Sequence, residues 1–402
     1  MSGCLPECIV ISRIKFPGYR HCRVADLIVC SIAYAAYGIR EPGKRYMVPY
    51  KWRMKMKAYV LEGIGELVYK EVPTPQLRED EVLVEVVNAG ICGSDIPRIF
   101  QTGTYHFPTI PGHEFAGIVR EAAGEKNASL VGKRAGVFPL IPCMQCEPCR
   151  EKAYEMCRSY NYLGSRTDGG FAQYVAVPAW NLIELPPEVS FEDAAMLEPA
   201  CVALHAIRQA HMEGVTSAAV YGCGTIGTLI VQWLAAMGIR QLYVIGTREE
   251  QHRLVSGFAA CTFCNCREED PVFFVTEQTE GRGVDIAFEC VGVKESVNNA
   301  VASVRAGGQI VFVGNPAGDI ALDKQIYWQI LRRQLTIYGT WNSSFTKEED
   351  DDWHRTVRAI REGRIAPARQ ITRRFSLDRL PEGLAVMQDK TVFTNKVMIG
   401  AV

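Results

Sequence analysis

Four cysteines lie within fifteen residues of one another, in the spacing Cys-x2-Cys-x2-Cys-x7-Cys: Cys143, Cys146, Cys149 and Cys157. Thiolates so close along the chain can converge on one tetrahedral zinc ion. Sulfur would then fill all four coordination positions and leave none for water or substrate, so such a zinc would be structural. The alternative, four unrelated cysteines, is disfavoured by the regular spacing.

A second group of possible metal ligands is dispersed along the chain. Cys92 stands in Cys-Gly-Ser-Asp, His113 in Gly-His-Glu and Glu198 in Glu-Pro. Each residue alone is weak evidence for a metal site, because a single histidine, for example, is more often a hydrogen-bonded core residue than a ligand. Together they offer sulfur, nitrogen and oxygen from three segments, which is typical of a catalytic zinc with one open position. Zinc in such a site lowers the pKa of a bound hydroxyl group.

Polar residues beside these ligands suggest supporting roles. Glu114 and Asp95 are expected to orient the ligands rather than to bind the metal. Ser94 can accept a proton from a substrate hydroxyl and pass it outward. We therefore expect the catalytic group to comprise Cys92, Ser94, His113, Glu114 and Glu198.

A glycine-rich motif, Gly222-Cys-Gly224-Thr225-Ile226-Gly227, points to a nucleotide. The pattern GxGxxG is weak by itself, since it also occurs in ordinary turns. Here it follows an apolar run at 218–222 and precedes an amphipathic pattern at 225–237, the strand–turn–helix context that a dinucleotide fold requires. The glycines would let the backbone approach a pyrophosphate, and the helix N-terminus would supply N–H donors.

The end of the next expected strand bears on cofactor choice. In NAD-binding folds an acidic residue there accepts hydrogen bonds from the ribose 2′-hydroxyl, but Gly246 occupies that position here, nineteen residues after Gly227. Glycine would leave room for a 2′-phosphate, and Thr247 and Arg248 follow, so the pattern favours NADP over NAD. Alternatively Arg248 merely begins an exposed helix, whose next two residues are glutamates that could restore NAD binding.

The elements that must position these residues fall into two kinds. Short apolar runs punctuated by glycine and proline up to about residue 189 indicate a β-rich domain. Between 218 and 314, apolar runs at 218–222, 241–247, 284–290 and 309–314 alternate with helix-length segments, which predicts a parallel doubly wound sheet. Gly292 and Gly314 stand at the ends of the last two runs and are assigned to the same cofactor site. The fold class is therefore α/β.

The composition sets broad limits. The 402 residues are 48% hydrophobic and 22% charged, with a net charge of −1, so a large core is expected and nucleic acid is not. A zinc-ribbon module that binds nucleic acid is disfavoured for the same reason. No apolar run is long enough to cross a membrane. The fifteen cysteines of so large a chain favour metal ligands and buried thiols over disulfides, hence a cytoplasmic protein.

Residues 1–53 differ from the rest, with cysteines in no metal-like spacing and an apolar stretch at 27–37 that is too short to span a bilayer. We interpret them as an extension of unknown role.

From residue 56 the sequence resembles the zinc-containing medium-chain dehydrogenases. The likeness is carried by residues 92–100, 112–115, 164–172 and 330–333, and within the family it is strongest to the galactitol-1-phosphate 5-dehydrogenases. It implies a GroES-like catalytic domain at 56–200 and 342–402, a Rossmann domain at 201–341, and a homodimer or homotetramer. It also implies that Cys92, His113 and Glu198 hold a catalytic zinc, and that the four-cysteine loop holds a structural one.

The resemblance implies an enzyme that oxidises a secondary alcohol of a polyol or polyol phosphate with NADP or NAD. Arg98 and Arg166 are candidate phosphate ligands, because a planar guanidinium suits phosphate. The alternative is that both are structural and pair with carboxylates such as Asp168. An unphosphorylated, sorbitol-like polyol or threonine remains open as substrate, as does a silent regulatory relative.

One departure from the family concerns proton transfer. Many members carry a histidine where this chain has Pro97. Proton exit would then use Ser94, water and the cofactor ribose.

Overall fold

A computed structural model describes residues 55–316 and 318–401. The proposed extension at 1–53 lies outside the described residues, so its interpretation as an extension stays a prediction. Within the described part of the chain, no helix is both long enough and apolar enough to cross a bilayer.

The first domain is built on a seven-stranded sheet of mostly antiparallel strands. Its order is β16-β17-β3-β4-β5-β9, and β8 pairs with β3. The bounds are β3 (Glu81–Ile91), β4 (Glu114–Ala122), β5 (Arg134–Val137), β8 (Tyr174–Pro178), β9 (Leu182–Glu184), β16 (Ile371–Ser376) and β17 (Lys396–Gly400). Two two-stranded antiparallel sheets accompany it, β1 (Met56–Gly63) with β2 (Glu66–Val72), and β6 (Leu140–Ile141) with β7 (Asn161–Tyr162).

The second domain holds a six-stranded parallel sheet in the order β12-β11-β10-β13-β14-β15. Its strands are β10 (Ser217–Tyr221), β11 (Gln241–Gly246), β12 (Thr262–Asn265), β13 (Val284–Glu289), β14 (Val304–Phe312) and β15 (Thr336–Gly339). The strand order reverses between β10 and β13, the point where doubly wound sheets bind their ligands. The predicted fold class, a β-rich GroES-like domain with a Rossmann domain, is confirmed.

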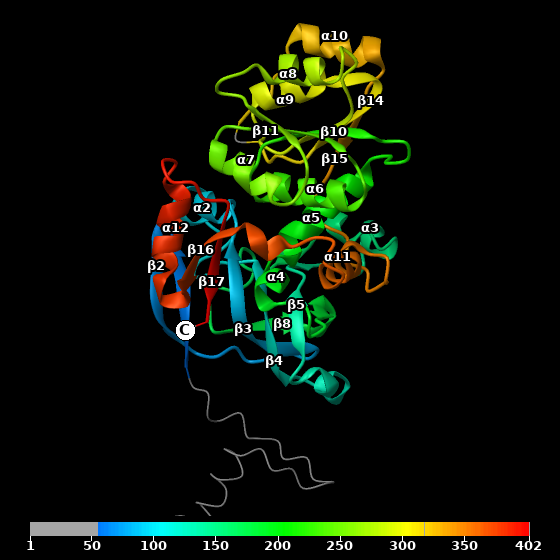
Figure 1. Ribbon diagram of the computed structural model, residues 1–402. Coiled ribbons are helices and arrows are strands. Elements are labelled where there is room, and N and C mark those ends of the chain that lie inside the picture. Colours follow the sequence, from blue (N-terminus) through cyan, green and yellow to red (C-terminus); the bar gives the residue numbers. More distant parts are fainter. Residues whose placement is uncertain (1–54, 317, 402) are drawn as a thin grey trace, which may run out of the picture. The chain divides into compact units, whose positions relative to one another are not determined.

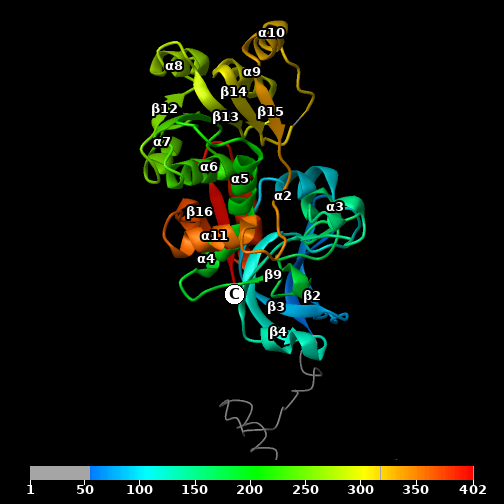
Figure 2. The ribbon, with the colours of Figure 1, turned by 90° about the vertical axis from the view of Figure 1, so that its right-hand side faces the viewer.

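Helices cover both faces of the parallel sheet. Figures 1 and 2 show α8 (Pro271–Gln278), α9 (Lys294–Ala302) and α10 (Lys324–Arg333) on one face, and α6 (Thr225–Ala236) and α7 (Glu249–Ser256) on the other. The longest helix, α5 (Leu197–Gln209), packs against α6 and α11 (Asp352–Arg361). The remaining helices are α2 (Asp95–Pro97), α3 (Glu147–Arg150), α4 (Phe191–Ala195) and α12 (Leu380–Gln388).

The end of the chain returns to the first domain. In Figure 1 the red strand β17 lies between β16 and β3, and it pairs with β3 in antiparallel register. The strands of the parallel sheet thus run from residue 217 to residue 339, and the strands on either side of that range share one sheet. This places residues near 396 against residues near 91 and 114.

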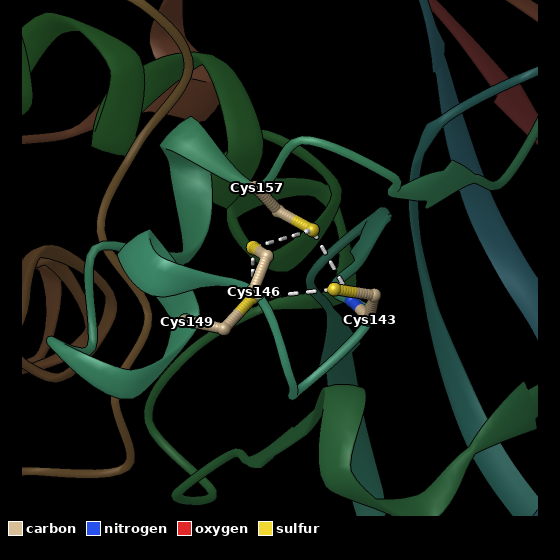
Figure 3. A group of neighbouring side chains, drawn as sticks. All are labelled: Cys143, Cys146, Cys149 and Cys157. Carbon is tan, nitrogen blue, oxygen red and sulfur yellow. Dashed lines mark hydrogen bonds between the residues drawn. The ribbon is translucent and has the colours of Figure 1, made fainter.

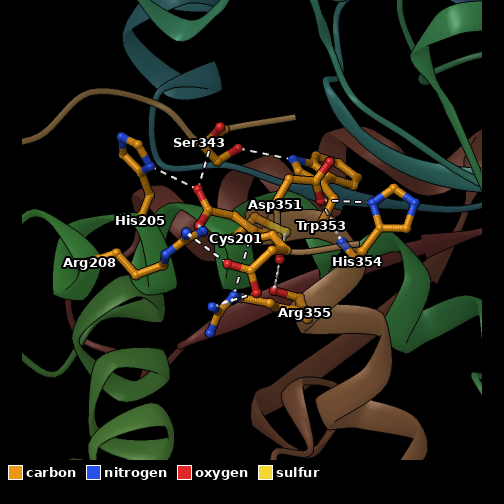
Figure 4. Close-up of polar contacts among 12 residues, drawn as sticks. Cys201, His205, Arg208, Ser343, Asp351, Trp353, His354 and Arg355 are labelled. Carbon is orange, nitrogen blue, oxygen red and sulfur yellow. Dashed lines mark hydrogen bonds and ion pairs between the residues drawn. The ribbon is translucent and has the colours of Figure 1, made fainter. Parts of the chain in front are cut away.

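A buried polar network fixes helix α5 to the returning chain (Figure 4). Asp352, which is fully buried, accepts hydrogen bonds from His205 Nδ1 at 2.8 Å, Arg208 Nη1 at 2.6 Å and the Ser344 N–H at 2.7 Å. Removing one partner of a buried ion pair typically costs about 3–5 kcal/mol, because the other charge is left without compensation. Helix α5, whose first turn carries Glu198, is therefore held firmly at its C-terminal end.

Candidate functional site

The four predicted zinc cysteines converge in one lobe around α3 (Figure 3). The Sγ atoms of Cys146 and Cys149 are 3.4 Å apart, and the pairs Cys143–Cys149 and Cys146–Cys157 are each 3.9 Å apart. These distances are too long for disulfides. Zn–S bonds of about 2.3 Å in a tetrahedron require sulfur atoms about 3.8 Å apart, so the cluster fits a closed zinc site.

Backbone N–H groups favour the thiolate form of Cys146 in this lobe, whereas burial raises the pKa of Cys149 to about 12. The N–H groups of Arg158 and Cys149 donate towards the sulfur of Cys146 and lower the pKa of that thiol to about 6. Since zinc binds the thiolate, these donors prepare the site for the metal.

Cys92, His113 and Glu114 form a second group. One potential ligand atom from each lies within 4.8 Å of the others. His113 and Glu114 are buried at the start of β4, whereas Cys92 is half-buried just after β3. Because β3 and β4 are paired antiparallel, the end of one strand meets the beginning of the other. Sheet register thus brings together residues about twenty positions apart in the sequence.

The turn after Cys92 orients this group. Asp95, which is fully buried, accepts the Cys92 N–H at 2.9 Å, and its Oδ1 lies 3.4 Å from His113 Nδ1 and 2.8 Å from Arg98 Nη1. Burial opposes ionisation of Asp95, but His113 and Arg98 lower its pKa below the ordinary value. The Ser94 hydroxyl donates to Cys92 Sγ at 3.3 Å. Asp95 therefore faces one ring nitrogen of His113 and leaves the other for a metal.

Glu198 is buried in the first turn of α5 but is not among the three residues grouped within 4.8 Å. Its Oε1 accepts a hydrogen bond from the Tyr162 hydroxyl at 3.2 Å, and the Tyr162 ring lies 5.8 Å from the His113 ring. Burial raises the pKa of Glu198 to about 7, so a cation beside it is needed for full ionisation at neutral pH. A half-buried thiol beside a buried imidazole and buried carboxylates fits a zinc ion.

Two residues near this group were not found by sequence reasoning. Tyr162 lies in a two-residue strand with no recognisable motif. Lys396 is 1% exposed and ion-pairs with Glu114, and its Nζ also donates to the Ile91 carbonyl at 3.1 Å. The available signal was a lysine beginning an otherwise apolar strand, because a buried lysine requires a partner.

The glycine motif has the geometry expected of a phosphate-binding turn. Gly222 has a φ of 98°, which favours glycine, and a Cβ on Gly227 would lie 1.8 Å from the Gly222 carbonyl oxygen. A Cβ on Gly224 would meet no atom within 4 Å, so this residue borders open space before α6. Thr225 donates from Oγ1 to the Asn395 carbonyl at 2.9 Å, and Ile226 is half-buried. The turn fits a dinucleotide pyrophosphate.

The other two predicted cofactor glycines meet at the ends of β13 and β14. Cβ atoms on Gly292 and Gly314 would lie 2.3 Å from the Asn315 carbonyl oxygen and the Gly292 nitrogen, respectively. The loop after β13 borders the Gly222 turn, since a Cβ on Gly222 would lie 2.7 Å from the Val291 side chain. Close packing therefore requires glycine here, and all these positions share one edge of the sheet.

At the end of β11 the structure corrects one expectation. Gly246 does not leave room beside itself, because a Cβ there would lie 2.6 Å from the Phe263 ring and 2.8 Å from Gln251 Oε1. Gln251 also accepts the Thr247 N–H at 2.8 Å. Open space instead lies beyond the strand, in a pocket of about 570 Å³ that Thr247 and Arg248 border.

This pocket carries charges of both signs. Its lining residues are Thr247, Arg248, Glu249, Glu250, Asn265, Arg267, Glu268, Lys390 and Thr391. The Arg248 guanidinium donates to the carbonyl groups of Lys390 and Thr391, so it connects the two domains.

The two arginines predicted to bind phosphate both have partners within the protein. Arg98 pairs with Asp95, as described above. The Arg166 guanidinium lies 4.1 Å and 4.3 Å from the rings of Tyr105 and Tyr160 and donates to the Tyr160 carbonyl at 2.8 Å. Asp168, the carboxylate suggested as a structural partner, instead accepts the Ile110 N–H. Arg98 is the better placed of the two, because it lies beside the Cys92 turn.

Comparison with known proteins gives two family matches, the Alcohol dehydrogenase GroES-like domain over residues 78–187 and the Zinc-binding dehydrogenase family over residues 225–362. Galactitol 1-phosphate 5-dehydrogenase of Escherichia coli K12 is 31% identical, over 82% of this chain and 95% of that protein. Sorbitol dehydrogenase and L-threonine 3-dehydrogenase of Bacillus subtilis are 29% and 31% identical, over 82% and 83% of this chain and 92% and 96% of theirs.

Solved structures of similar dehydrogenases have the same fold as this chain. Galactitol-1-phosphate dehydrogenase from Escherichia coli superposes with a TM-score of 0.78 at 31% identity, and a zinc-binding dehydrogenase from Sinorhizobium meliloti bound to NADP with 0.79 at 29%. Each comparison covers 86% of this chain and 99% of the other.

We predict two zinc ions per chain, one in each ligand group. Cys143→Ser and Cys92→Ser should each reduce the zinc content from two to one. Cys143→Ser should also lower the Tm strongly, because a closed zinc site contributes folding free energy, whereas Cys92→Ser should stay folded. Cys264→Ser, a buried thiol outside both groups, is the control and should keep two ions. A single zinc in the intact wild-type protein would refute the prediction.

Proposed function

The chain belongs to the zinc-dependent medium-chain alcohol dehydrogenases, and from that membership we propose that it oxidises a secondary alcohol of a polyol phosphate resembling galactitol 1-phosphate. Members of the family are oxidoreductases that act on CH–OH groups with zinc and NAD(P).

The observation that carries the proposal is the position of two consecutive residues before and in β17. The Asn395 amide donates to the Cys223 carbonyl in the glycine motif at 3.1 Å, and Lys396 pairs with Glu114 beside Cys92 and His113. Consecutive Cα atoms are about 3.8 Å apart. The cofactor turn and the metal ligands are therefore close enough for one dinucleotide to reach from its pyrophosphate to the metal.

The chain's own residues then have definite roles. Cys92, His113 and Glu198 are proposed to hold the catalytic zinc, with Glu114 beside them, and Asp95 keeps the His113 ring oriented. Zinc in this site supplies Lewis acidity that lowers the pKa of the substrate hydroxyl. Ser94 receives the hydroxyl proton and passes it to water or the cofactor ribose, because Pro97 cannot relay it. Bound NAD(P) would accept the hydrogen of the alcohol carbon as hydride, and the alcohol would become a ketone.

The phosphorylated substrate is supported by two relatives, since the curated proteins similar to this chain include galactitol 1-phosphate 5-dehydrogenase and D-arabitol-phosphate dehydrogenase. Arg98 supports it structurally, because its contact with Asp95 uses one of its five N–H donors. Arg166 contributes less, because aromatic rings and a carbonyl already engage its guanidinium.

A screen of polyols and polyol phosphates tests the substrate. Galactitol 1-phosphate should give a kcat/KM at least about tenfold above that of galactitol, a difference of about 1.4 kcal/mol in transition-state binding. Arg98→Lys keeps the charge but loses the planar fork, so it should raise KM for the phosphorylated substrate only. Arg166→Lys serves as the comparison. Equal kcat/KM for both polyols would favour an unphosphorylated polyol.

Sorbitol-like polyols and threonine are the second candidates, because sorbitol and threonine dehydrogenases match this chain at similar identity. A silent regulatory relative is disfavoured, since every proposed ligand is retained. The same screen separates these alternatives.

For the cofactor we propose NADP. No carboxylate stands at Gly246 to repel a 2′-phosphate, and Arg248, Arg267 and Lys390 border the pocket at the end of β11. The three glutamates of that pocket oppose this choice. Arg248 would have to leave its carbonyl partners or share its donors with the phosphate.

The ratio of kcat/KM for NADP to that for NAD tests this preference. We expect a ratio above one in the wild type that falls about tenfold or more in Arg248→Ala, because a charge-assisted pair with phosphate is lost. Glu249→Ala and Glu250→Ala should leave or raise the ratio. A wild-type ratio well below one that Arg248→Ala does not alter would eliminate both the preference and its cause.

We also propose a homodimer formed through β15 and α10. Strand β15 is an edge strand of the parallel sheet. Within the described part of the chain, no residue of α10 is buried. Tyr327, Leu331 and Ile337 are 54%, 54% and 40% exposed, an apolar surface beside an open strand edge. A second copy would cover this surface by two-fold symmetry and extend the sheet.

Light scattering tests the assembly. The wild type should have the mass of a dimer or of a tetramer built from such dimers, and Leu331→Glu should halve it, because a charge would be buried at the interface. Val131→Glu, at an exposed apolar residue of the other domain, is the control. A wild-type monomer, or an oligomer that survives Leu331→Glu, would contradict the proposal.

A further inference from the structure

Lys396 is a buried lysine beside the group formed by Cys92, His113 and Glu114. Its side chain is 2% exposed, and the carboxylate of Glu114 with which it pairs is 1% exposed. A buried lysine that keeps its charge must stay close to its partner, because an unpaired buried charge is strongly unfavourable.

Glu114 has little freedom to move. A Cβ on Gly90 would lie 2.3 Å from Glu114 Oε2 and 3.3 Å from the Lys396 side chain, so only glycine at this position leaves space for the ion pair. Glu114 also belongs to the group with Cys92 and His113 whose ligand atoms lie within 4.8 Å of one another. One carboxylate is thus within reach of two cations, the lysine ammonium and a metal.

Glu198 has a different environment. Its hydrogen-bond partner is the neutral hydroxyl of Tyr162, and it takes part in no ion pair within residues 55–316 and 318–401. Its negative charge is therefore free to be matched by a metal, whereas that of Glu114 is matched by the protein.

The charges of the site balance only when Lys396 is included. Thiolate at Cys92 and carboxylates at Glu114 and Glu198 carry three negative charges. Zinc supplies two positive charges and Lys396 the third, while Asp95 and Arg98 compensate each other. Without Lys396 the buried site would hold an excess negative charge, and Glu114 would be drawn to the metal.

We propose that Lys396 is a positioning residue that competes with the catalytic metal for the Glu114 carboxylate, and so keeps one coordination position open for the substrate hydroxyl. This inference rests on the proposed function of the Cys92 site. If Glu114 were released it would occupy the open position, bind the metal more tightly and obstruct the alcohol.

A double-mutant cycle tests the competition with Lys396→Met, Glu114→Gln and the combination of the two. In each protein the catalytic zinc is replaced by Co²⁺, and the visible spectrum, the rate of metal loss to a chelator and kcat are measured. Lys396→Met should alter the spectrum, slow metal loss about tenfold and lower kcat about tenfold, because a fourth protein ligand is gained. In the Glu114→Gln background, the same lysine change should alter the two rates less than about twofold.

Lys133→Met is the matched control, since Lys133 forms an exposed ion pair with Glu184 far from these ligands in the sheet. It should retain wild-type values in all three measurements. Wild-type behaviour of Lys396→Met would overturn the proposal. Equal effects of that change in the wild-type protein and in the Glu114→Gln background would overturn it as well.

The lysine variant leaves a buried carboxylate unpaired and could fail to fold. Glu114→Gln and the double variant contain no unpaired carboxylate. If Lys396→Met does not fold, the comparison of these two variants tests the proposal. Matching spectra and rates support the proposal, and a difference would show that Lys396 acts without Glu114. Measurements on the wild-type protein distinguish failure of this inference from failure of the proposed function. Absence of zinc or of dehydrogenase activity would defeat the proposed function, whereas an active two-zinc enzyme without coupling would defeat only this inference.

Discussion

The ion pair between Lys396 and Glu114 is the contact on which the arrangement of the site depends. It joins the last strand of the chain to the first residue of β4, and the preceding Asn395 holds the glycine turn of the other domain. A buried ion pair is costly to form unless its geometry is good, and costly to break once formed. It therefore constrains the returning strand, the proposed metal ligands and the proposed cofactor turn to one relative position.

A second constraint acts through helix α5. Its first turn presents Glu198 towards Tyr162, and its last turns are held by Asp352 in the returning chain. Beside this helix, the aromatic residues Phe138, Phe345 and Trp353 pack with ring centroids 5.1–5.7 Å apart. Polar anchoring at one end and dense apolar packing along the side leave α5 little freedom, which suits the proposed role of Glu198 as a metal ligand.

The cofactor edge follows from topology. In a parallel sheet all strands end on the same side, so the loops after β10, β11, β13 and β14 necessarily meet there. Close packing then requires the glycines, as the short distances from hypothetical Cβ atoms at Gly227, Gly292 and Gly314 indicate. The same packing closes the space at Gly246, so this glycine favours NADP only by lacking a carboxylate, and any direct contact with a 2′-phosphate lies with charged side chains farther out.

The sequence by itself determined the features that depend on near neighbours. The spacing of the four cysteines, the glycine motif and the alternation of apolar runs each act within one element or turn. They predicted the fold class, which is confirmed, and they predicted the cysteine lobe and the glycine turn as the metal and cofactor sites proposed here. Tertiary structure alone decided which distant groups meet. Lys396 and Glu114 are 282 positions apart, and the pairs Tyr162–Glu198 and Arg208–Asp352 carry no local pattern. Arg166 shows the same limit, because its guanidinium stacks on Tyr105, a ring sixty-one positions away that no short stretch of sequence pairs with it.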